Sequence, residues 1–222
     1  MYTTQCPKGG LTVSYAESLL KCEFDFGVLA KKPVVQRDAP LGSCFTMCCK
    51  WAKALLEGPT TSPQHLKDML EREIENIAPV HAIYIKETSA SLPPLKRMEG
   101  YRNAIKAFHL TAPCLADGDE IPAFSTKPDD DLDWMGCIKG DMWCAVYMWS
   151  MQQEKPFAGI LSDDKHSVGL FCPGDSFRIW DMNAGEFLVT GRVQWRTWCR
   201  GFEAFETKGK TLDKVQLIPV KR

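Results

Sequence analysis

The sequence feature that most constrains the fold is the stretch 44–57, which contains neither proline nor glycine. Gly42 precedes it, and Gly58-Pro59 follows it. Within the stretch, apolar side chains recur at the three- and four-residue spacing of a buried helix face. We therefore expect a helix that begins at Cys44, ends at Gly58 and buries one face in the core.

Cys44 would then lie in the first turn of this helix. The positive end of the helix dipole and the unpaired N–H groups of a first turn favour the thiolate, which is the nucleophilic form of cysteine. A cysteine on a helix is more often a small buried apolar residue. Cys44 alone therefore does not define a catalytic site.

Composition and charge narrow the class of protein. The chain has 222 residues, of which 45% are hydrophobic and 25% charged, as in an ordinary globular domain. The net charge of −1 gives no reason to expect nucleic acid as a partner. No apolar run reaches the roughly 18 residues of a membrane span, and no basic segment followed by an apolar one marks a Sec-type signal. We expect a protein with no integral membrane span.

The ten cysteines and four histidines show no metal-binding pattern. No Cys-x-x-Cys pair occurs, and the histidines have no zinc-ligand spacing relative to the cysteines. The cysteine content is low for a disulfide scaffold, and several cysteines lie inside apolar segments, as buried thiols do. We expect reduced thiols, no structural metal and no cofactor.

Hydrophobic periodicity and turn residues predict the order of elements. Helices are expected over 15–22, 44–57, 62–77, 95–110 and 195–205. Strands are expected over 80–85, 142–149, 166–171, 177–181, 186–190 and 215–220. Residues 1–10, 23–39 and 111–141 are expected to be irregular, the last as a long loop with an acidic run at 129–131. His81 is expected to be a packed or hydrogen-bonded residue.

His166 and Asp181 occupy opposite ends of the predicted hairpin. His166 opens the first strand and Asp181 closes the second, so antiparallel pairing would bring the two side chains together at one end of the sheet. A carboxylate there can hold the imidazole in one tautomer while the other ring nitrogen faces a thiol. Considered separately, His166 is most simply interpreted as a histidine in a turn, and Asp181 as a cap at the end of a strand. Together with Cys44 they form a candidate Cys–His–Asp triad.

Three segments carry a family resemblance: Gly42-Ser43-Cys44-Phe45, His166-Ser167-Val168-Gly169-Leu170 and Asp181-Met182-Asn183-Ala184-Gly185-Glu186-Phe187. In type, order and spacing they resemble the YopT-type effector cysteine proteases, a family of bacterial virulence and avirulence proteins, over roughly 36–205. The chain departs from the family pattern at Ser167, where alanine is usual, and at Met182, where proline is usual.

The resemblance implies an α+β, papain-like fold, in which an N-terminal helical part carrying the nucleophile packs on an antiparallel sheet carrying histidine and aspartate. It gives Cys44 as nucleophile, His166 as base and Asp181 as the residue that orients the base. It also implies a papain-like catalytic domain over 36–222, preceded by an extension over 1–35.

Papain-like enzymes also need donors for the oxyanion of the tetrahedral intermediate. The backbone N–H of Cys44 is the natural first donor. A side-chain donor about six residues before the nucleophile is usual in such enzymes, but that position is Asp38, which donates nothing when ionised. We expect Gln36 to serve, with Arg37 as the less favoured candidate.

The resemblance implies an effector that leaves a bacterium through a specialised, non-Sec system and cleaves a specific protein in the host cytoplasm. Membrane-anchored GTPases or kinases are the family-type substrates, and a secretion chaperone or other delivery partner is compatible with this route. Two alternatives stay open: a glutamine deamidase or transglutaminase with the same triad, and a catalytically silent binding module on the same scaffold.

Overall fold

The computed structural model describes residues 16–40, 42–89, 91–116, 121–125, 141–163, 166–206, 212 and 214–222. Among these residues, seven strands form one sheet in the order β1-β6-β5-β4-β3-β7-β2, and every neighbouring pair is antiparallel. The strands are β1 (Leu20–Glu23), β2 (Ala123–Ser125), β3 (Phe157–Ser162), β4 (Ser167–Cys172), β5 (Ser176–Asp181), β6 (Gly185–Thr190) and β7 (Lys214–Val220).

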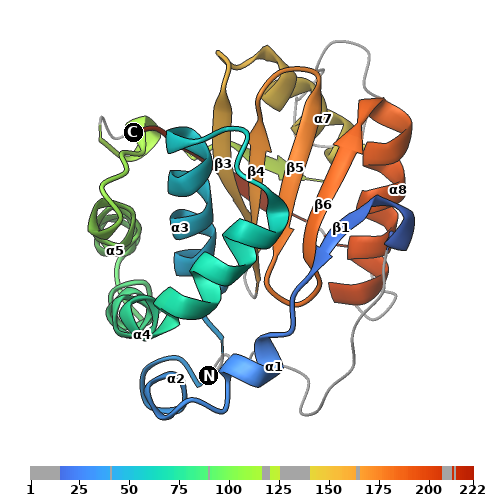
Figure 1. Ribbon diagram of the computed structural model, residues 1–222. Coiled ribbons are helices and arrows are strands. Elements are labelled where there is room, and N and C mark those ends of the chain that lie inside the picture. The colour runs from blue at the N-terminus through green and yellow to red at the C-terminus, as the bar shows by residue number, and fades with distance from the viewer. Residues whose placement is uncertain are drawn as a thin grey trace.

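Helices cover both faces of this sheet. They are α1 (Phe26–Leu29), α2 (Pro33–Asp38), α3 (Cys44–Glu57), α4 (Pro63–Glu87), α5 (Pro94–Ala107), α6 (Pro113–Ala116), α7 (Met142–Gln152) and α8 (Gly191–Glu206), with a 3-10 turn over Glu17–Leu19. In Figure 1, α3, α4 and α5 lie on one side of the sheet and α8 on the other. The architecture is a mixture of helices and an antiparallel sheet, as the sequence predicted.

The two faces of the sheet belong to two separate hydrophobic clusters. Phe171 and Trp180 pack with the helices on the α3 side. Leu170, Ile179 and Phe187 pack with α7 and α8 on the other side. Successive residues of a strand point to opposite faces, so a strand covered on both sides is apolar throughout. All six residues of β3 and of β4 are accordingly buried.

Several predicted elements are confirmed. Helix α3 has the predicted bounds, and the hairpin, the strand after it and the last strand match β4, β5, β6 and β7 to within about one residue. Helix α4 begins as expected, because the Ser62 side chain accepts a hydrogen bond from the backbone N–H of His65 at 3.2 Å and Pro63 occupies the first turn. The expected third helix is α5.

The strand predicted over 80–85 is wrong. Helix α4 continues through Pro79 to Glu87, so the predicted end at 77 was ten residues short. The buried side chains Ile74, Ile77, His81 and Tyr84 continue one helix face through this segment. The packing of that face outweighs the missing N–H of the proline.

The strand predicted over 142–149 is also wrong, because this segment is helix α7. A run that is apolar at every position has no period, so it fits a buried strand and a buried helix equally well. The deciding signal was Asp141, whose Oδ1 accepts a hydrogen bond from the Cys144 N–H at 2.9 Å and caps the helix. The strand that the prediction missed is β3, which lies between β4 and β7.

The N-terminal predictions need correction as well. The expected helix over 15–22 is a short 3-10 turn followed by β1, and the expected irregular segment 23–39 contains α1 and α2. Strand β1 pairs with β6, and Phe24 and Phe26 lie in the α3-side cluster. Residues 16–35 thus contribute to the same sheet and core as the rest of the described chain.

Two further predictions are met only in part. Residues 1–10 and the acidic run 129–131 lie outside the described residues. The described parts of 111–141 include α6 and β2, where a loop was expected. Cysteines 22, 44, 48, 49, 114, 172 and 199 are thiols, but Cys144 is in a disulfide bond, so the expectation of reduced thiols throughout is wrong at that position.

Candidate active site

The strand hairpin brings His166 and Asp181 together. His166 lies just before β4 and Asp181 ends β5, and these neighbouring strands are antiparallel. His166 Nε2 lies 2.9 Å from Asp181 Oδ1. The aspartate is 0% exposed and the histidine 7%. A hydrogen bond between such buried groups is well shielded from water, which makes it a strong constraint on the imidazole ring.

The turn after Asp181 fixes its carboxylate. Oδ1 of Asp181 also accepts a hydrogen bond from the backbone N–H of Asn183 at 2.8 Å, and the Asp181 carbonyl accepts one from the Ala184 N–H at 3.2 Å. This is the side-chain turn that aspartate forms readily with the residue two positions on. The turn therefore orients the Asp181 carboxylate independently of its hydrogen bond with His166.

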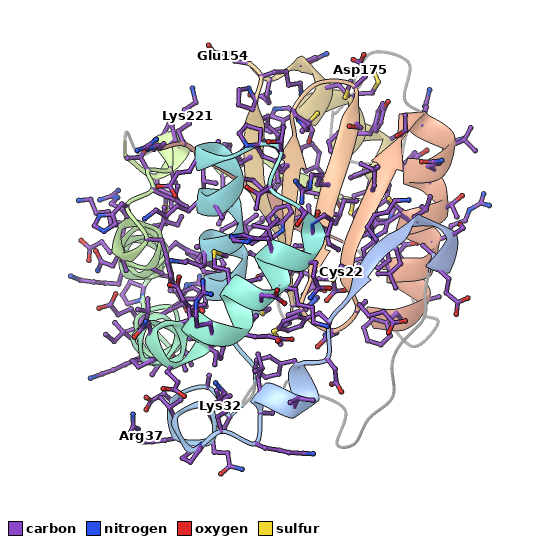
Figure 2. All side chains as sticks on the ribbon, in the orientation of Figure 1. Cys22, Lys32, Arg37, Glu154, Asp175 and Lys221 are labelled. Atoms are coloured by element: carbon purple, nitrogen blue, oxygen red, sulfur yellow. The ribbon has the colours of Figure 1, made fainter. Side chains whose placement is uncertain are left out.

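Gly185 completes this turn for a steric reason. Its φ is +129°, a conformation that side chains rarely adopt, and a Cβ there would lie 1.9 Å from the Cys22 carbonyl oxygen of β1. Only glycine lets β1 approach this closely. In Figure 2, Cys22 lies where β1 passes close to α4, and its sulfur is 3.5 Å from Gln64 Oε1 of that helix.

Cys44 is the first residue of α3. Gly42, at φ +109°, makes the preceding turn, and its N–H donates to the Ala39 carbonyl at 3.0 Å. The Met47 N–H donates to the Ser43 carbonyl at 2.9 Å, so the N–H groups of the first turn point out of the helix start. Cys44 is half-buried, whereas the other two cysteines of α3 are fully buried.

Those two buried cysteines differ chemically from Cys44. Burial raises the pKa of both the Cys48 and Cys49 thiols. For Cys48, the nearby Cys44, Cys49 and Asp181 raise the pKa further. Cys48 is thus a protonated thiol in the interior, close to both Cys44 and Asp181, and is unsuited to act as a nucleophile.

Two contacts dock α3 on β4. The Cys48 sulfur donates to the Ser167 carbonyl at 3.5 Å. One turn further on, a Cβ at Gly169 would lie 2.6 Å from Cε3 of Trp51, so the indole ring lies directly against the backbone of β4. Helix and strand therefore run side by side in the same direction.

His81 stabilises the first turn of α3 from the neighbouring helix α4. Its Nδ1 lies 3.2 Å from the Thr46 hydroxyl oxygen, and that hydroxyl donates to the Ser43 carbonyl at 3.2 Å. Because the hydroxyl proton is used in this way, Nδ1 of His81 carries a proton and donates to Thr46. Burial lowers the pKa of His81 from 6.5 to about 4. The prediction of a packed or hydrogen-bonded histidine is confirmed.

The candidate oxyanion residues lie on α2. Gln36 is exposed on this helix, and the Arg37 guanidinium donates to the Asp38 carboxylate through Nε at 2.7 Å. The Arg37 hydrogen bond lowers the pKa of Asp38. Figure 2 shows Lys32 and Arg37 at the end of the molecule formed by α2. A role for Gln36 as oxyanion donor stays a prediction.

The sequence did not single out a buried polar cluster on the α3 side of the sheet. Glu186 of β6 is 1% exposed and accepts hydrogen bonds from Trp51 Nε1 at 3.0 Å and Arg178 Nε at 2.6 Å. The available signal was a carboxylate directly before Phe187, in a strand whose other buried residues are apolar. Such a residue is almost never buried without charged or polar partners.

Other kinds of site find no support in the part of the chain that the structure describes. No group of histidine, cysteine, aspartate and glutamate side chains there could hold a metal ion. None of the described helices combines the length and apolar character needed to cross a membrane.

A solved structure with a similar fold is the crystal structure of the Pseudomonas avirulence protein AvrPphB. The superposition has a TM-score of 0.63 at 12% sequence identity and covers 93% of this chain and 100% of that chain. No protein-family model matches the sequence, and no curated protein matches it significantly. At this identity the comparison establishes the fold alone, which in both proteins combines helices with an antiparallel sheet.

Proposed function

We propose that this protein is a cysteine protease with Cys44 as nucleophile, His166 as general base and Asp181 as the carboxylate that orients the base. The observation that carries the proposal is the buried hydrogen bond of 2.9 Å between His166 Nε2 and Asp181 Oδ1. An ionised carboxylate only accepts hydrogen bonds, so Nε2 must be the protonated nitrogen of the neutral ring. The lone pair is then on Nδ1, and in this proposal it is the nitrogen that takes a proton from the thiol.

The docking of α3 supports Cys44 as that thiol. The Cys48 sulfur meets the carbonyl of Ser167, the first residue of β4. Cys44 lies one turn earlier on the same helix face, about 6 Å back along the axis, which corresponds to about two residues of strand. In this proposal the Cys44 turn is level with the chain just before β4, where His166 lies. The effect of both Cys44 and Asp181 on the pKa of Cys48 agrees with it.

The reaction would then follow the thiol-protease scheme. Nδ1 of His166 takes the Cys44 proton, and the thiolate attacks the carbonyl carbon of a peptide bond. The tetrahedral oxyanion accepts a hydrogen bond from the Cys44 N–H at the helix start and, in this proposal, from Gln36. The imidazolium protonates the leaving amine, and water activated by His166 hydrolyses the thioester. This chemistry requires no cofactor.

The fold of an avirulence protein supports a bacterial effector as the biological setting. The substrate in this proposal is a specific host protein, met in the host cytoplasm after export by a non-Sec route, with a secretion chaperone as a delivery partner. The papain-like arrangement of nucleophile helix and sheet that the motifs implied forms part of the same proposal.

The test compares the wild-type protein with Cys44→Ala, and with Cys114→Ala as a control. Cys114 is a second half-buried thiol, in α6, so it reports the reactivity of a cysteine of similar exposure. Iodoacetamide should modify Cys44 at least about tenfold faster than Cys114 at pH 7. New protein N-termini should appear in host lysate treated with wild type or Cys114→Ala, and be absent with Cys44→Ala.

The products separate this proposal from the alternatives that use the same triad. A deamidase leaves the backbone of its substrate intact and converts glutamine to glutamate, and a transglutaminase leaves a new cross-link. Equal alkylation rates at Cys44 and Cys114, together with no product of any kind, would leave a binding module as the function.

A further inference from the structure

Glu186 is a buried carboxylate for which catalysis by the triad has no direct use. Its side chain lies on the α3 side of the sheet, since Phe187, the next residue, packs on the other side. Oε2 accepts a hydrogen bond from Trp51 Nε1, and Oε1 accepts one from Arg178 Nε. Burial raises the pKa of Glu186. Burying such a group costs free energy that an apolar residue of similar volume would avoid.

Arg178 extends the contacts of Glu186 to the far end of α3. Its Nη1 donates to the carbonyl of Thr61 at 2.7 Å and to that of Pro59 at 3.3 Å, both in the turn after α3. The cluster Trp51–Glu186–Arg178 therefore joins β5 and β6 to the middle of α3 and to its exit turn. These contacts fix α3 relative to the same hairpin that carries Asp181.

The hydrogen bond from Trp51 restrains a motion that packing alone leaves open. The indole ring lies flat enough against Gly169 that no Cβ fits between them. Such a contact limits how closely α3 and β4 approach but resists sliding along the strand only weakly. The bond from Trp51 Nε1 to Glu186 is directional, so together with the longer bond from the Cys48 sulfur to the Ser167 carbonyl it fixes the position of the helix along its axis.

The axial position of α3 at Trp51 also sets the position of Cys44, because a helix moves along its axis as a rigid unit. Cys44 precedes Trp51 by two turns, or about 10 Å. A shift of α3 by a fraction of an ångström at Trp51 therefore moves the Cys44 sulfur by a similar amount. Catalytic groups tolerate only about 0.5 Å of misplacement, and a 1 Å error can cost roughly 100-fold in rate.

We propose that Glu186, held by Trp51 and Arg178, is a positioning residue that sets the register of α3 along β4 and thereby the distance from the Cys44 sulfur to the His166 ring. This inference rests on the proposed function. It assigns Glu186 to the geometry of the reaction and not to the reaction itself, and it explains why a carboxylate occupies this buried site.

The experiment uses Trp51→Phe, which removes the indole N–H and keeps an aromatic ring against Gly169. Its matched control is Trp143→Phe, because Trp143 Nε1 also donates to a glutamate, Glu203, at 2.7 Å, on the opposite side of the sheet. The measurement is the second-order rate of Cys44 alkylation by iodoacetamide between pH 5 and pH 9, with the rate at Cys114 as internal reference. Thermal unfolding of each variant is recorded alongside.

Trp51→Phe should slow alkylation of Cys44 by roughly tenfold at pH 7 and move the midpoint of the pH profile towards that of an ordinary cysteine. The rate at Cys114 should not change, and Trp143→Phe should retain the wild-type profile at Cys44. Glu186→Gln should reproduce the effect of Trp51→Phe. If Glu186→Gln does not fold, Trp51→Phe alone decides.

Two results overturn the proposal, and they are distinct. If wild-type Cys44 reacts faster than Cys114 and Trp51→Phe has the same pH profile while melting at a lower temperature, the cluster is structural only and the proposed function stands. If wild-type Cys44 reacts no faster than Cys114, the proposed function fails and this inference fails with it.

Discussion

Replacing His81 with asparagine should make the stability of this protein less sensitive to acid. His81 is 4% exposed, and burial lowers its pKa from 6.5 to about 4. Below pH 6.5 the unfolded chain binds a proton that the folded protein does not accept until the pH approaches 4. Stability therefore falls as the pH is lowered through this window, because the unfolded state binds more protons.

The size of the effect follows from the two pKa values. Their difference corresponds to about 3 kcal/mol at the acid end of the window, at 1.36 kcal/mol per pKa unit. Between pH 7 and pH 5 the loss is about 2 kcal/mol, since the unfolded histidine is already largely protonated at pH 5. Asparagine can still donate to the Thr46 hydroxyl but does not titrate, so this loss should be absent in His81→Asn.

The assay is urea unfolding of wild type and His81→Asn at pH 7, 6 and 5. Carboxylates and other groups titrate in both proteins, so they cancel in the difference between the two curves. His65→Asn is the control, because His65 is exposed in the first turn of the same helix. If wild type and His81→Asn lose the same free energy of unfolding between pH 7 and pH 5, His81 is not held neutral by burial and the reasoning is refuted.

Three further outcomes test the site. Gly185→Ala should lower the free energy of unfolding, measured in urea, by about 3 kcal/mol or more. The reason is that its Cβ would lie 1.9 Å from the Cys22 carbonyl oxygen, at a φ of +129°. A loss below about 0.5 kcal/mol would contradict the close approach of β1. Asp181→Asn should reduce proteolysis at least about 100-fold, since the amide no longer selects the same imidazole tautomer, and unchanged cleavage kinetics would exclude the triad. Iodoacetamide at pH 8 should modify Cys44 but not Cys48 in the folded protein, since burial raises the pKa of Cys48; peptide mass mapping would reveal the opposite order.

The sequence predicted best those elements whose ends or turns are marked by particular residue types. Helix α3 was predicted to the residue because glycines bound it and its apolar face has a clear period. The hairpin of β4 and β5 was predicted because its turn residues separate two β-rich runs. The pairing of His166 with Asp181 followed from the rule that antiparallel strands bring opposite ends together, and the hydrogen bond between them agrees with it.

Prediction failed where tertiary packing decides between equally good local structures. Residues 142–149 are apolar throughout, and only their burial between the sheet and α8 and the Asp141 cap make this segment a helix. Residues 80–85 include three β-branched residues and a tyrosine, yet they continue α4 because their buried face packs with α3 and α5. Strand β3 was missed because both of its faces are covered, which removes the alternation that marks a strand.

The segment from Asp181 to Phe187 meets several separate physical requirements within a few residues. Asp181 fixes the His166 ring and its own turn, and Gly185 gives β1 room to pair. Glu186 then points to the α3 side and binds Trp51, while Phe187 points to the α8 side and fills the other core. Asp181, Gly185, Glu186 and Phe187 therefore each meet a different physical requirement. This segment of seven residues thereby connects His166, the edge strand β1 and helix α3 to strands β5 and β6.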